Sequence, residues 1–599
     1  MFDLARDLFA KQGDRIFLEK TRGVLVVSEA VFKKKHKDIQ EEKWFLFWKR
    51  QEALHEPPNF LLTHKISNEE VFLTEKTTVT LFKIEISERL FFVLLKKTMV
   101  TVEEGFSITE HVDNEDCIRG HGMARNRPFC LEIQIAVSSL VLENIKRMPL
   151  NSIGCSLKSV SLRDTELINI LPKLRINEDC EIEEFELVAT RREHVAEVLA
   201  QEKPFCVGRV RKIGFEDYAV GVITKMSLED CGFEWLCLAA TRREHVVEVF
   251  AQENPFCVGG VKIMWLWDYA VGVITKMSLE DCGVEDLRLT ASEEAHVAEV
   301  LKKENPFCVG RVRKICFEDY AVGVITKMSL EDCGVEDLRL TASEEAHVAE
   351  VLKQENPFCV GRVRKICFED YAVGVITKMS PEDCEIEDLR LYAPRKEHVA
   401  AVLKQKESFC VWRVKNMALE GYAGNVITKM IFHEDNTMEG FVLDGNKDQL
   451  SRILRRRDNS IDIGRIRLDG FRVPEREVRR KLRYVLTDRG RVYFNNAYNP
   501  TYDNYNAYDI ARERERKKRE RVRESERERK EREENQTELG YTLVDRENVW
   551  DEKKEREIER EFGFHHLKGP RRNPEYIFDK EEGADILRDT SMWGKNMWV

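Results

Sequence analysis

Residues 181–435 consist of five tandem copies of a 51-residue unit, and this repeat constrains the fold more than any other feature of the chain. Two neighbouring copies, 283–333 and 334–384, differ only at Lys303/Gln354 and Leu330/Pro381. A fixed period near 50 residues indicates a stack of small units, each of which buries its apolar face only against its neighbours. A series of equivalent copies makes a surface, whereas catalysis needs one unique constellation of residues. We therefore expect a binding scaffold, not an enzyme.

A shorter pattern lies inside each unit. The order apolar-x-x-apolar-x-apolar, which is typical of the strand of a leucine-rich repeat, starts at Val284 and again at Val312. It also starts at Cys130, Leu157, Ile182, Val210, Phe233, Val261, Val335, Val363, Ile386, Val414, Met438 and Ile463. Each 51-residue unit therefore holds two coils. We predict an α/β fold in which residues 130–470 form a leucine-rich-repeat-like solenoid, a parallel sheet backed by helices.

Two segments of each unit are expected to form the helices behind the sheet. Residues 292–301 begin with Ser292 as a candidate N-cap and carry Val297, Val300 and Leu301 on one stripe. Residues 320–328 have apolar side chains at helical spacing. Because parallel strands lie about 4.8 Å apart, equivalent residues of successive units should recur about every 10 Å along the sheet.

Three segments at the start of the repeats resemble a known family. Leu157–Leu162, the run Leu-Ile-Asn-Ile-Leu-Pro at 167–172, and Ile182–Leu187 are similar to the F-box-associated homology (FTH-type) domain of nematode proteins. The resemblance covers this stretch well and the rest of the chain only through the repeat pattern. It implies the substrate-binding half of a ubiquitin-ligase adaptor, with an upstream F-box that docks a Skp1-like linker.

The N-terminal region, residues 1–129, contains no recognisable F-box. It offers an aromatic run at 43–48 and a β-rich stretch at 71–102, but no Leu-Pro start followed by the expected helices. We treat it as an unassigned α+β region.

One histidine and one cysteine recur at the same two positions of every unit. A zinc ion needs four ligands at about 2.0–2.3 Å, so copies about 10 Å apart cannot share one. No unit holds a C-x-x-C or an H-x-x-x-H motif, and a Cys–His nucleophile would imply five identical sites. We interpret both rows as packing positions and predict no catalytic residue, metal or cofactor. The rows are His194, His245, His296, His347, His398 and Cys206, Cys257, Cys308, Cys359, Cys410.

Charge and composition favour a soluble protein. The chain has 97 Lys and Arg against 108 Asp and Glu, with a net charge of −11. Most of the sixteen cysteines recur with the repeat, and residues 1–20 lack the apolar core of a secretory signal. No apolar stretch is long enough to cross a membrane. We expect an intracellular protein, cytoplasmic or nuclear, without a membrane partner.

The x positions of the strand pattern should face the open, concave side of the sheet. They are charged in most copies, as at Asp286 and Arg288, so they either neutralise one another or face a partner. The strands from Phe233 and Val261 carry tryptophan there instead, and exposed aromatic clusters often anchor protein interfaces. The alternative is drift after duplication, with Trp265 and Trp267 folding inward or covering a neighbouring residue. The predicted partner-binding residues are Trp235, Cys237, Ile263, Trp265, Arg288, Arg313 and Lys314.

The C-terminal region differs in composition. We expect a helix plus an Asn/Tyr-rich linker in 471–510, the linker itself at 493–509, and an Arg/Glu-rich helix and partly disordered tail in 511–599. Residues 512–534 contain 12 basic and 9 acidic side chains, a mixture that favours a solvated helix. RNA binding through arginine is the alternative, although the glutamates would oppose phosphate.

These observations favour a protein-interaction scaffold that selects substrates for ubiquitin ligation. A second hypothesis is a scaffold of a ribonucleoprotein or RNA-processing complex, contacted through the Arg/Glu-rich tail. A third takes the near-identical copies as a young duplication without a dedicated ligand.

Overall fold

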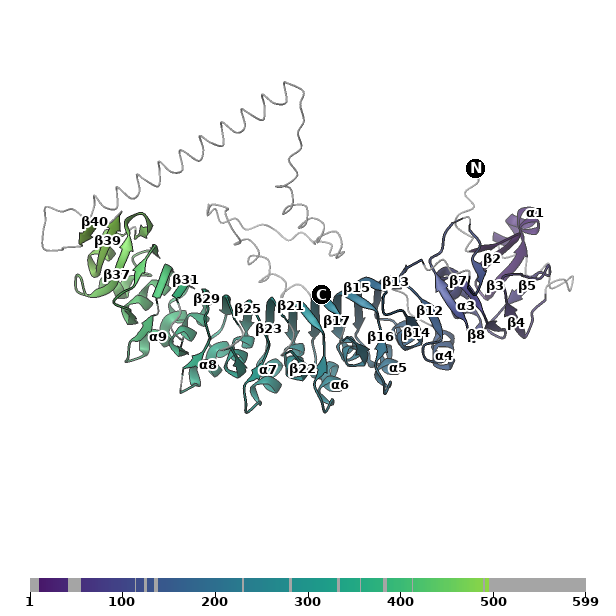
Figure 1. Cartoon of the computed structure of the whole chain (residues 1–599), viewed down its shortest axis with the longest axis horizontal. Helices are drawn as coiled ribbons and strands as arrows, with labels where there is room; N and C mark the ends of the chain where they lie inside the picture. The colour runs from purple at the N-terminus through teal and green to yellow at the C-terminus, as the bar shows by residue number, and fades with distance from the viewer. Residues whose placement is uncertain are drawn as a thin grey trace, which may run out of the picture. The chain divides into compact units, whose positions relative to one another are not determined.

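The computed structural model describes residues 10–40 and 55–494, with short gaps at 114, 123–126, 134–137, 229–230, 280–282, 331–333, 356, 381–384, 412, 474 and 489–490. The predictions for the aromatic run at 43–48 and for residues 495–599 lie outside the described residues. Figure 1 labels the elements in chain order.

One sheet of 14 strands dominates the described chain. Its strands follow one another in chain order and every neighbouring pair is parallel. This confirms an α/β fold with a long parallel sheet. The strands are β11 (Phe129–Ile133), β13 (Leu157–Arg163), β15 (Glu181–Ala189), β17 (Arg209–Asp217), β19 (Gly232–Ala240), β21 (Gly260–Asp268), β23 (Asp286–Ala291), β25 (Lys314–Asp319), β27 (Asp337–Ala342), β29 (Lys365–Asp370), β31 (Glu385–Ala393), β33 (Arg413–Gly421), β36 (Gly440–Asp444) and β38 (Phe471–Arg472).

Alternate residues of each strand build the core. In β23 and β25 these are Leu287, Leu289, Ile315 and Phe317, each at most 1% exposed. Leu287 pairs with Ile315 and Leu289 with Phe317, and the same register continues into the next strands. Apolar side chains therefore stack on apolar side chains along one face, while the intervening residues project from the other face.

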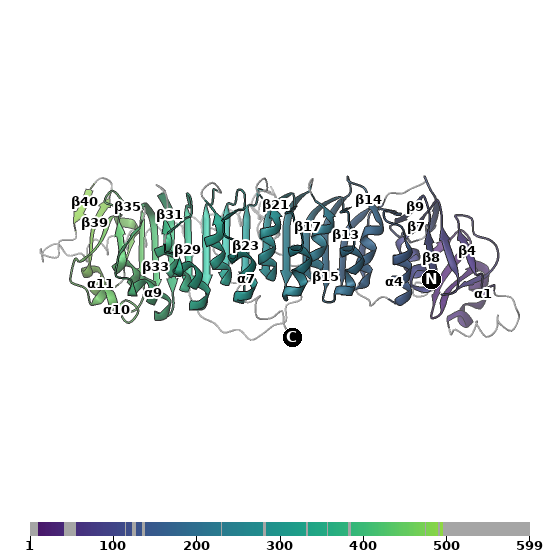
Figure 2. The same cartoon turned by 90° about the horizontal axis from the view of Figure 1, so that it is seen from below.

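Helical segments cover the core face of the sheet, and all lie on the same side of it (Figures 1 and 2). After one strand of each unit, the run beginning Tyr-Ala forms a 3₁₀ helix: η4 (Tyr218–Lys225), η6 (Tyr269–Lys276), η7 (Tyr320–Lys327), η9 (Tyr371–Lys378) and η11 (Tyr422–Lys429). After the other strand come α5 (Ala196–Leu199), α6 (Val247–Phe250), α7 (Glu294–Leu301), α8 (Ala349–Lys353) and α9 (Ala400–Lys404). A 3₁₀ turn precedes each except α7: η3 (Arg192–His194), η5 (Arg243–Val246), η8 (Glu345–Val348) and η10 (Lys396–Val399).

The cap of α7 differs from the prediction. Glu293, not Ser292, occupies the N-cap position, because Ser292 directs its hydroxyl to the Asp268 carboxylate at 2.8 Å. This contact joins two successive coils.

Short two-stranded parallel sheets close each unit at the bends. They pair β16 (Phe205–Cys206) with β18 (Met226–Ser227), β20 (Phe256–Cys257) with β22 (Met277–Ser278), β24 (Phe307–Cys308) with β26 (Met328–Ser329), β28 (Phe358–Cys359) with β30 (Met379–Ser380), and β32 (Phe409–Val411) with β34 (Met430–Phe432). The repeated cysteines belong to the first strand of each pair.

Besides β11 and β13, the described part of residues 10–176 holds three small sheets and three α-helices, which thus extend beyond the 1–129 region into the first repeats. The stretch expected to be β-rich, 71–102, also holds α3, so it is mixed. The strands are β1 (Ala10–Gln12), β2 (Arg15–Lys20), β3 (Gly23–Ser28), β4 (Asn59–Leu62), β5 (Val71–Leu73), β6 (Thr78–Leu81), β7 (Ile84–Ser87), β8 (Met99–Val102), β9 (Phe106–Thr109), β10 (Ile118–Gly120), β12 (Ile153–Cys155) and β14 (Leu174–Ile176). The helices are α1 (Glu29–Gln40), α3 (Glu88–Lys97) and α4 (Ser139–Arg147), with the 3₁₀ helix η2 (Glu166–Lys173).

The end of the repeats departs from the strand pattern. The pattern at Ile463 lies in β37 (Ile461–Arg467), which does not extend the main sheet but joins β35 (Thr437–Met438), β39 (Leu482–Asp488) and β40 (Arg491–Phe494) in a separate sheet. For residues 471–510 the sequence predicts a helix and a linker at 493–509; the described part contains α11 (Arg476–Lys481) and also the antiparallel β39–β40 pair, which the prediction does not include. The other helices here are α10 (Ser451–Leu454) and η12 (Leu468–Gly470).

Within the described residues, no helix has both the length and the apolar character that crossing a membrane requires.

Candidate binding face of the sheet

Three rows of side chains run across the strands on the face that the helices leave open. They are defined by register pairs, which place one residue of each strand beside its equivalent in the next. Row 1 is Glu184, Lys212, Trp235, Ile263, Asp286, Lys314, Asp337, Lys365, Asp388 and Asn416. Row 2 is Glu186, Gly214, Cys237, Trp265, Arg288, Cys316, Arg339, Cys367, Arg390 and Ala418. Row 3 is Val188, Glu216, Ala239, Trp267, Thr290, Glu318, Thr341, Glu369, Tyr392 and Glu420.

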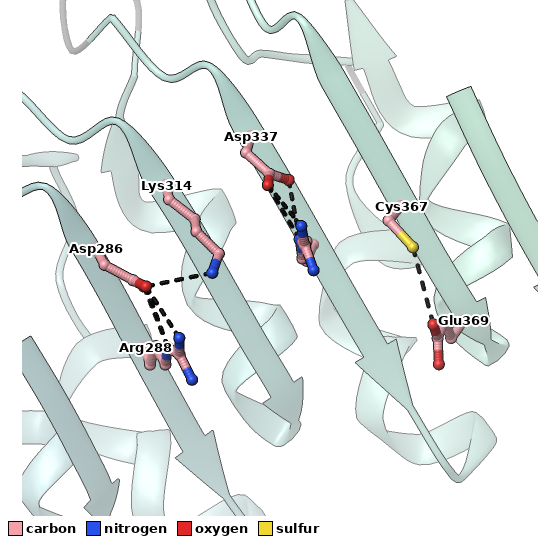
Figure 3. A network of polar contacts seen from close by, with 7 residues as sticks. Asp286, Arg288, Lys314, Asp337, Cys367 and Glu369 are labelled. Atoms are coloured by element: carbon pink, nitrogen blue, oxygen red, sulfur yellow. Dashed lines mark hydrogen bonds and ion pairs between the residues drawn. The ribbon is translucent and has the colours of Figure 1, made fainter. Parts of the chain in front are cut away.

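Rows 1 and 2 neutralise one another over β23 to β27. The guanidinium of Arg288 donates to both carboxylate oxygens of Asp286 at 3.0–3.3 Å, and Lys314 lies 3.3 Å from the same carboxylate (Figure 3). Arg339 repeats the arrangement with Asp337 at 2.9 Å. The predicted site residues Arg288 and Lys314 therefore both form ion pairs with the same carboxylate, that of Asp286.

Four of the predicted site residues do lie together. Trp235, Cys237, Ile263 and Trp265 occupy neighbouring positions of β19 and β21, and Trp267 lies beside them; we call these five residues the aromatic patch. All five are partly exposed, so the tryptophans do not fold into the core. The rings of Trp235 and Trp265 meet edge to face, with centroids 5.7 Å apart.

The surroundings of the aromatic patch hold it in place. Gly214 of β17 has no side chain, and a Cβ added there would lie 3.6 Å from the ring of Trp235, so this ring lies across the glycine. On the other side, the guanidinium carbon of Arg288 lies 4.8 Å from the centroid of the Trp265 ring. The ring of Trp265 is thus held between an aromatic edge and a cation.

Arg313 lies apart from the other predicted site residues. It precedes the first residue of β25, is exposed, and pairs with Glu336 at 3.5 Å before the start of β27. Arg211–Glu234 and Arg364–Glu387 repeat this contact in other units at 2.9 and 2.5 Å. The strand pattern placed Arg313 on the open face, but the strand itself begins one residue later.

Row 3 is a feature that the sequence pattern missed, because the six-residue pattern ends at the last apolar residue of each strand. Burial raises the pKa of Glu318 to about 7, with the neighbouring charge of Asp319 adding to the effect. Burial also raises the pKa of Glu216 and of Glu369. Thr290 donates to Glu318 at 3.4 Å. The Cys367 thiol lies 3.8 Å from Glu369, as Figure 3 shows. In each strand of the repeats, core-face and open-face residues alternate with period two. Extending this alternation by one residue beyond the six-residue pattern would have identified row 3.

The thiols of row 2 have little nucleophilic character. Burial raises the pKa of Cys316 and of Cys367 to about 12, and it also raises the pKa of Cys237. The thiolate is the reactive form of cysteine, so these three side chains stay in the unreactive form at neutral pH.

The repeated histidines are buried and lie beside aspartates, not beside the repeated cysteines. His296 is 5% exposed, and its Nδ1 lies 3.0 Å from Oδ1 of Asp268. Over the described residues, no group of three or more His, Cys, Asp or Glu side chains is arranged to hold a metal ion.

Comparison of the chain with known proteins finds no matching family model, no matching curated protein and no matching solved structure.

Proposed function

We propose that the protein is a leucine-rich-repeat-like solenoid that recognises another protein through the open face of its sheet and catalyses no reaction. The aromatic patch carries this proposal. It interrupts rows that elsewhere in the repeats are mostly charged, and it exposes three indole rings on two adjacent strands.

The energetics of interfaces favour the aromatic patch as the anchor. Tryptophan is enriched among the few residues that supply most of the binding free energy, often above 2 kcal/mol each. The rings of Trp235 and Trp265 are already held against each other and against Arg288, so ordering them on binding costs little entropy. Paired charges such as Arg288 and Asp286 add specificity more than affinity.

An adaptor role in ubiquitin ligation is the more specific form of this proposal. Its support is the resemblance of 157–187 to the F-box-associated family. In this role the open face would hold the ligase substrate and the N-terminal region would contact a Skp1-like linker.

Affinity purification of the full-length chain tests protein recognition. Tagged wild type and the double variant Trp235→Ala/Trp265→Ala are used to capture partners from cell extract, and the partners are identified by mass spectrometry. We expect the double variant to lose at least tenfold of a partner that wild type enriches. A Skp1-like linker and a cullin among the wild-type partners would support the adaptor role, and their absence would contradict it.

Val247→Ala is the control. Val247 lies in α6, on the helix-covered side of the sheet and away from the open face, and is 51% exposed. It should leave capture unchanged. Circular dichroism confirms that each variant is folded. Full capture by the folded double variant would refute recognition through the aromatic patch.

A further inference from the structure

Row 3 repeats with the same period as the units. Glu216, Trp267, Glu318, Glu369 and Glu420 are equivalent positions on β17, β21, β25, β29 and β33. Between them lie Ala239, Thr290, Thr341 and Tyr392 on the intervening strands. With about 4.8 Å between strands, successive equivalent positions are about 9.6 Å apart. The row is thus a line of regularly spaced acidic positions, with an indole at the second.

The cations of the sheet leave most of these carboxylates unpaired. Arg288 and Arg339, in row 2, turn to the aspartates of row 1. Among the described residues, Glu216, Glu318 and Glu369 form no ion pair. Only Glu420, at the C-terminal end of the row, pairs with an arginine, Arg390, at 3.0 Å. Three partly buried carboxylates therefore face the open side without an ion pair. Burial raises their pKa values, and it outweighs the opposing effects of Arg163 on Glu216, Arg288 on Glu318 and Arg390 on Glu369.

Such carboxylates destabilise the free protein. Removing a carboxylate from water costs free energy unless a cation or hydrogen bonds replace the water. The single contacts from the Thr290 hydroxyl and the Cys367 thiol do not supply a positive charge. A positively charged ligand would supply this charge. Binding would be most favourable for a ligand whose positive charges have the same spacing as the carboxylates of row 3.

An extended polypeptide can have that spacing. In the polyproline II conformation each residue advances the chain by about 3.1 Å, so every third residue recurs at about 9.3 Å. This matches the interval of about 9.6 Å between positions of the row. Charges at every second or every fourth residue would recur at about 6 or 12 Å and would lose register within two units.

The indole at the second position is compatible with the same ligand. An aromatic ring attracts a cation placed over its face, and the neighbouring Trp265 already holds the Arg288 guanidinium in this way. Trp267 can therefore accept a lysine or arginine side chain in line with the glutamates.

We propose that the open face binds an extended basic protein segment that crosses the strands along row 3, with lysine or arginine at every third residue. This inference rests on the proposed protein recognition and adds the chemistry of the partner.

Two fluorescein-labelled peptides of identical composition test the spacing. The first repeats Lys-Pro-Pro five times, and the second has the same five lysines in one block followed by the ten prolines. Fluorescence anisotropy with the full-length protein at pH 8 and physiological salt measures both affinities. We expect the spaced peptide to bind at least tenfold more tightly than the block peptide.

Neutralising the row tests the site. The double variant Glu318→Gln/Glu369→Gln should weaken the spaced peptide at least tenfold and remove its advantage over the block peptide. The control Glu294→Gln/Glu345→Gln changes the net charge equally at exposed positions of α7 and η8, and it should bind like wild type. Equal affinity for both peptides, or equal binding by both double variants, would overturn the proposal.

The two proposals can fail separately. If neither peptide binds while cellular partners still depend on Trp235 and Trp265, the basic spacing is wrong and protein recognition stands. If Trp235→Ala/Trp265→Ala captures partners as well as wild type does, recognition through the aromatic patch is wrong, whatever the peptides show.

Discussion

The carboxylate of Asp268, the last residue of β21, lies 3.0 Å from Nδ1 of His296 in α7, the helix that follows the next strand. Asp268 has φ of 52°, a left-handed value that favours glycine. Its Oδ1 accepts hydrogen bonds from the backbone N–H and the hydroxyl of Ser292, at 3.3 and 2.8 Å. Asp217–His245, Asp319–His347 and Asp370–His398 repeat the pair at 2.9–3.1 Å, with φ of 55–57° at the aspartate. One strained residue per unit thus ties two coils together.

The last unit shows that the two residues act as a pair. Gly421 replaces the aspartate at the end of β33, with φ of 64°. Gln449 replaces the histidine, and its Oε1 accepts the N–H of Asn446 at 2.9 Å, just as Nδ1 of His296 accepts the N–H of Glu293 at 3.2 Å. Where the carboxylate is absent, glycine relieves the strain and glutamine keeps the second contact of the histidine.

Two substitutions of Asp319 separate the effect of its carboxylate contacts on stability from the effect of its strained backbone. In Asp319→Gly the carboxylate contacts are lost but the left-handed backbone is no longer strained. In Asp319→Ala the contacts are lost and the strain remains. We expect the alanine variant to be less stable than the glycine variant by about 1–2 kcal/mol. Urea unfolding measures the difference, and equal stability of the two variants would contradict a role for strain.

The histidine should tolerate glutamine better than alanine. His347→Gln can keep the hydrogen bond from the backbone N–H of Glu344, which Nδ1 of His347 now accepts at 3.3 Å. His347→Ala loses that bond and leaves a cavity beside Tyr320, whose ring contacts His347, costing about 2 kcal/mol or more. Thermal unfolding should show a clearly larger loss for alanine. The same substitutions at His296 provide a replicate, because the surrounding unit is almost identical in sequence.

The aspartates also predict how stability depends on pH. Burial acts to raise the pKa values of Asp217, Asp268 and Asp319, but the contact with the paired histidine and hydrogen bonds from Thr241, Ser292 or Ser343 outweigh it and lower them below the ordinary 3.8. Their stabilisation is therefore complete above about pH 4 and is lost as the pH falls through the lowered values. Asp268→Asn/Asp319→Asn should lower the melting temperature at pH 7 and have little effect near pH 2. A loss that is independent of pH would contradict this.

The sequence predicted those features that follow from local periodicity. The apolar positions of a strand, such as Leu287 and Leu289, were identifiable because alternation and a fixed period leave only one burial pattern. Trp235 and Trp265 could be placed on one face for the same reason. These predictions need no knowledge of how side chains orient.

Features that depend on a specific neighbour were not predictable in this way. The pairing of Arg288 and Lys314 with one acid, Asp286, requires the register of two strands and the side-chain conformations. The departure of β37 from the main sheet depends on its pairing with β35 and β39, since the pattern at Ile463 fits either sheet. The strain at Asp268 had one signal in the sequence, which was the glycine at the equivalent position, Gly421.

Glu318 should cost the free protein stability at high pH. Because burial raises its pKa to about 7, above the ordinary 4.5, the folded state favours the protonated form. Stability from this group is therefore greatest below about pH 4.5 and is lost as the pH rises through 7. Glu318→Gln should raise the melting temperature at pH 8 by a few degrees, and the gain should shrink towards pH 5. A variant less stable than wild type at pH 8 would show that Glu318 is satisfied in the free protein.

The same group predicts a pH dependence of basic-peptide binding. The charged groups that influence Glu318 are Asp319, Arg288 and Glu369, and the Thr290 hydroxyl donates to it. Between pH 6 and pH 8 the carboxyl loses its proton, so the row gains negative charge and the spaced lysine peptide should bind several-fold more tightly at pH 8. Fluorescence anisotropy at constant ionic strength measures this change. In Glu318→Gln binding should be weaker and nearly the same at both values of pH, whereas the exposed control Glu294→Gln should keep the wild-type dependence. An undiminished pH dependence in Glu318→Gln would assign the titration to another group and remove Glu318 from the peptide site.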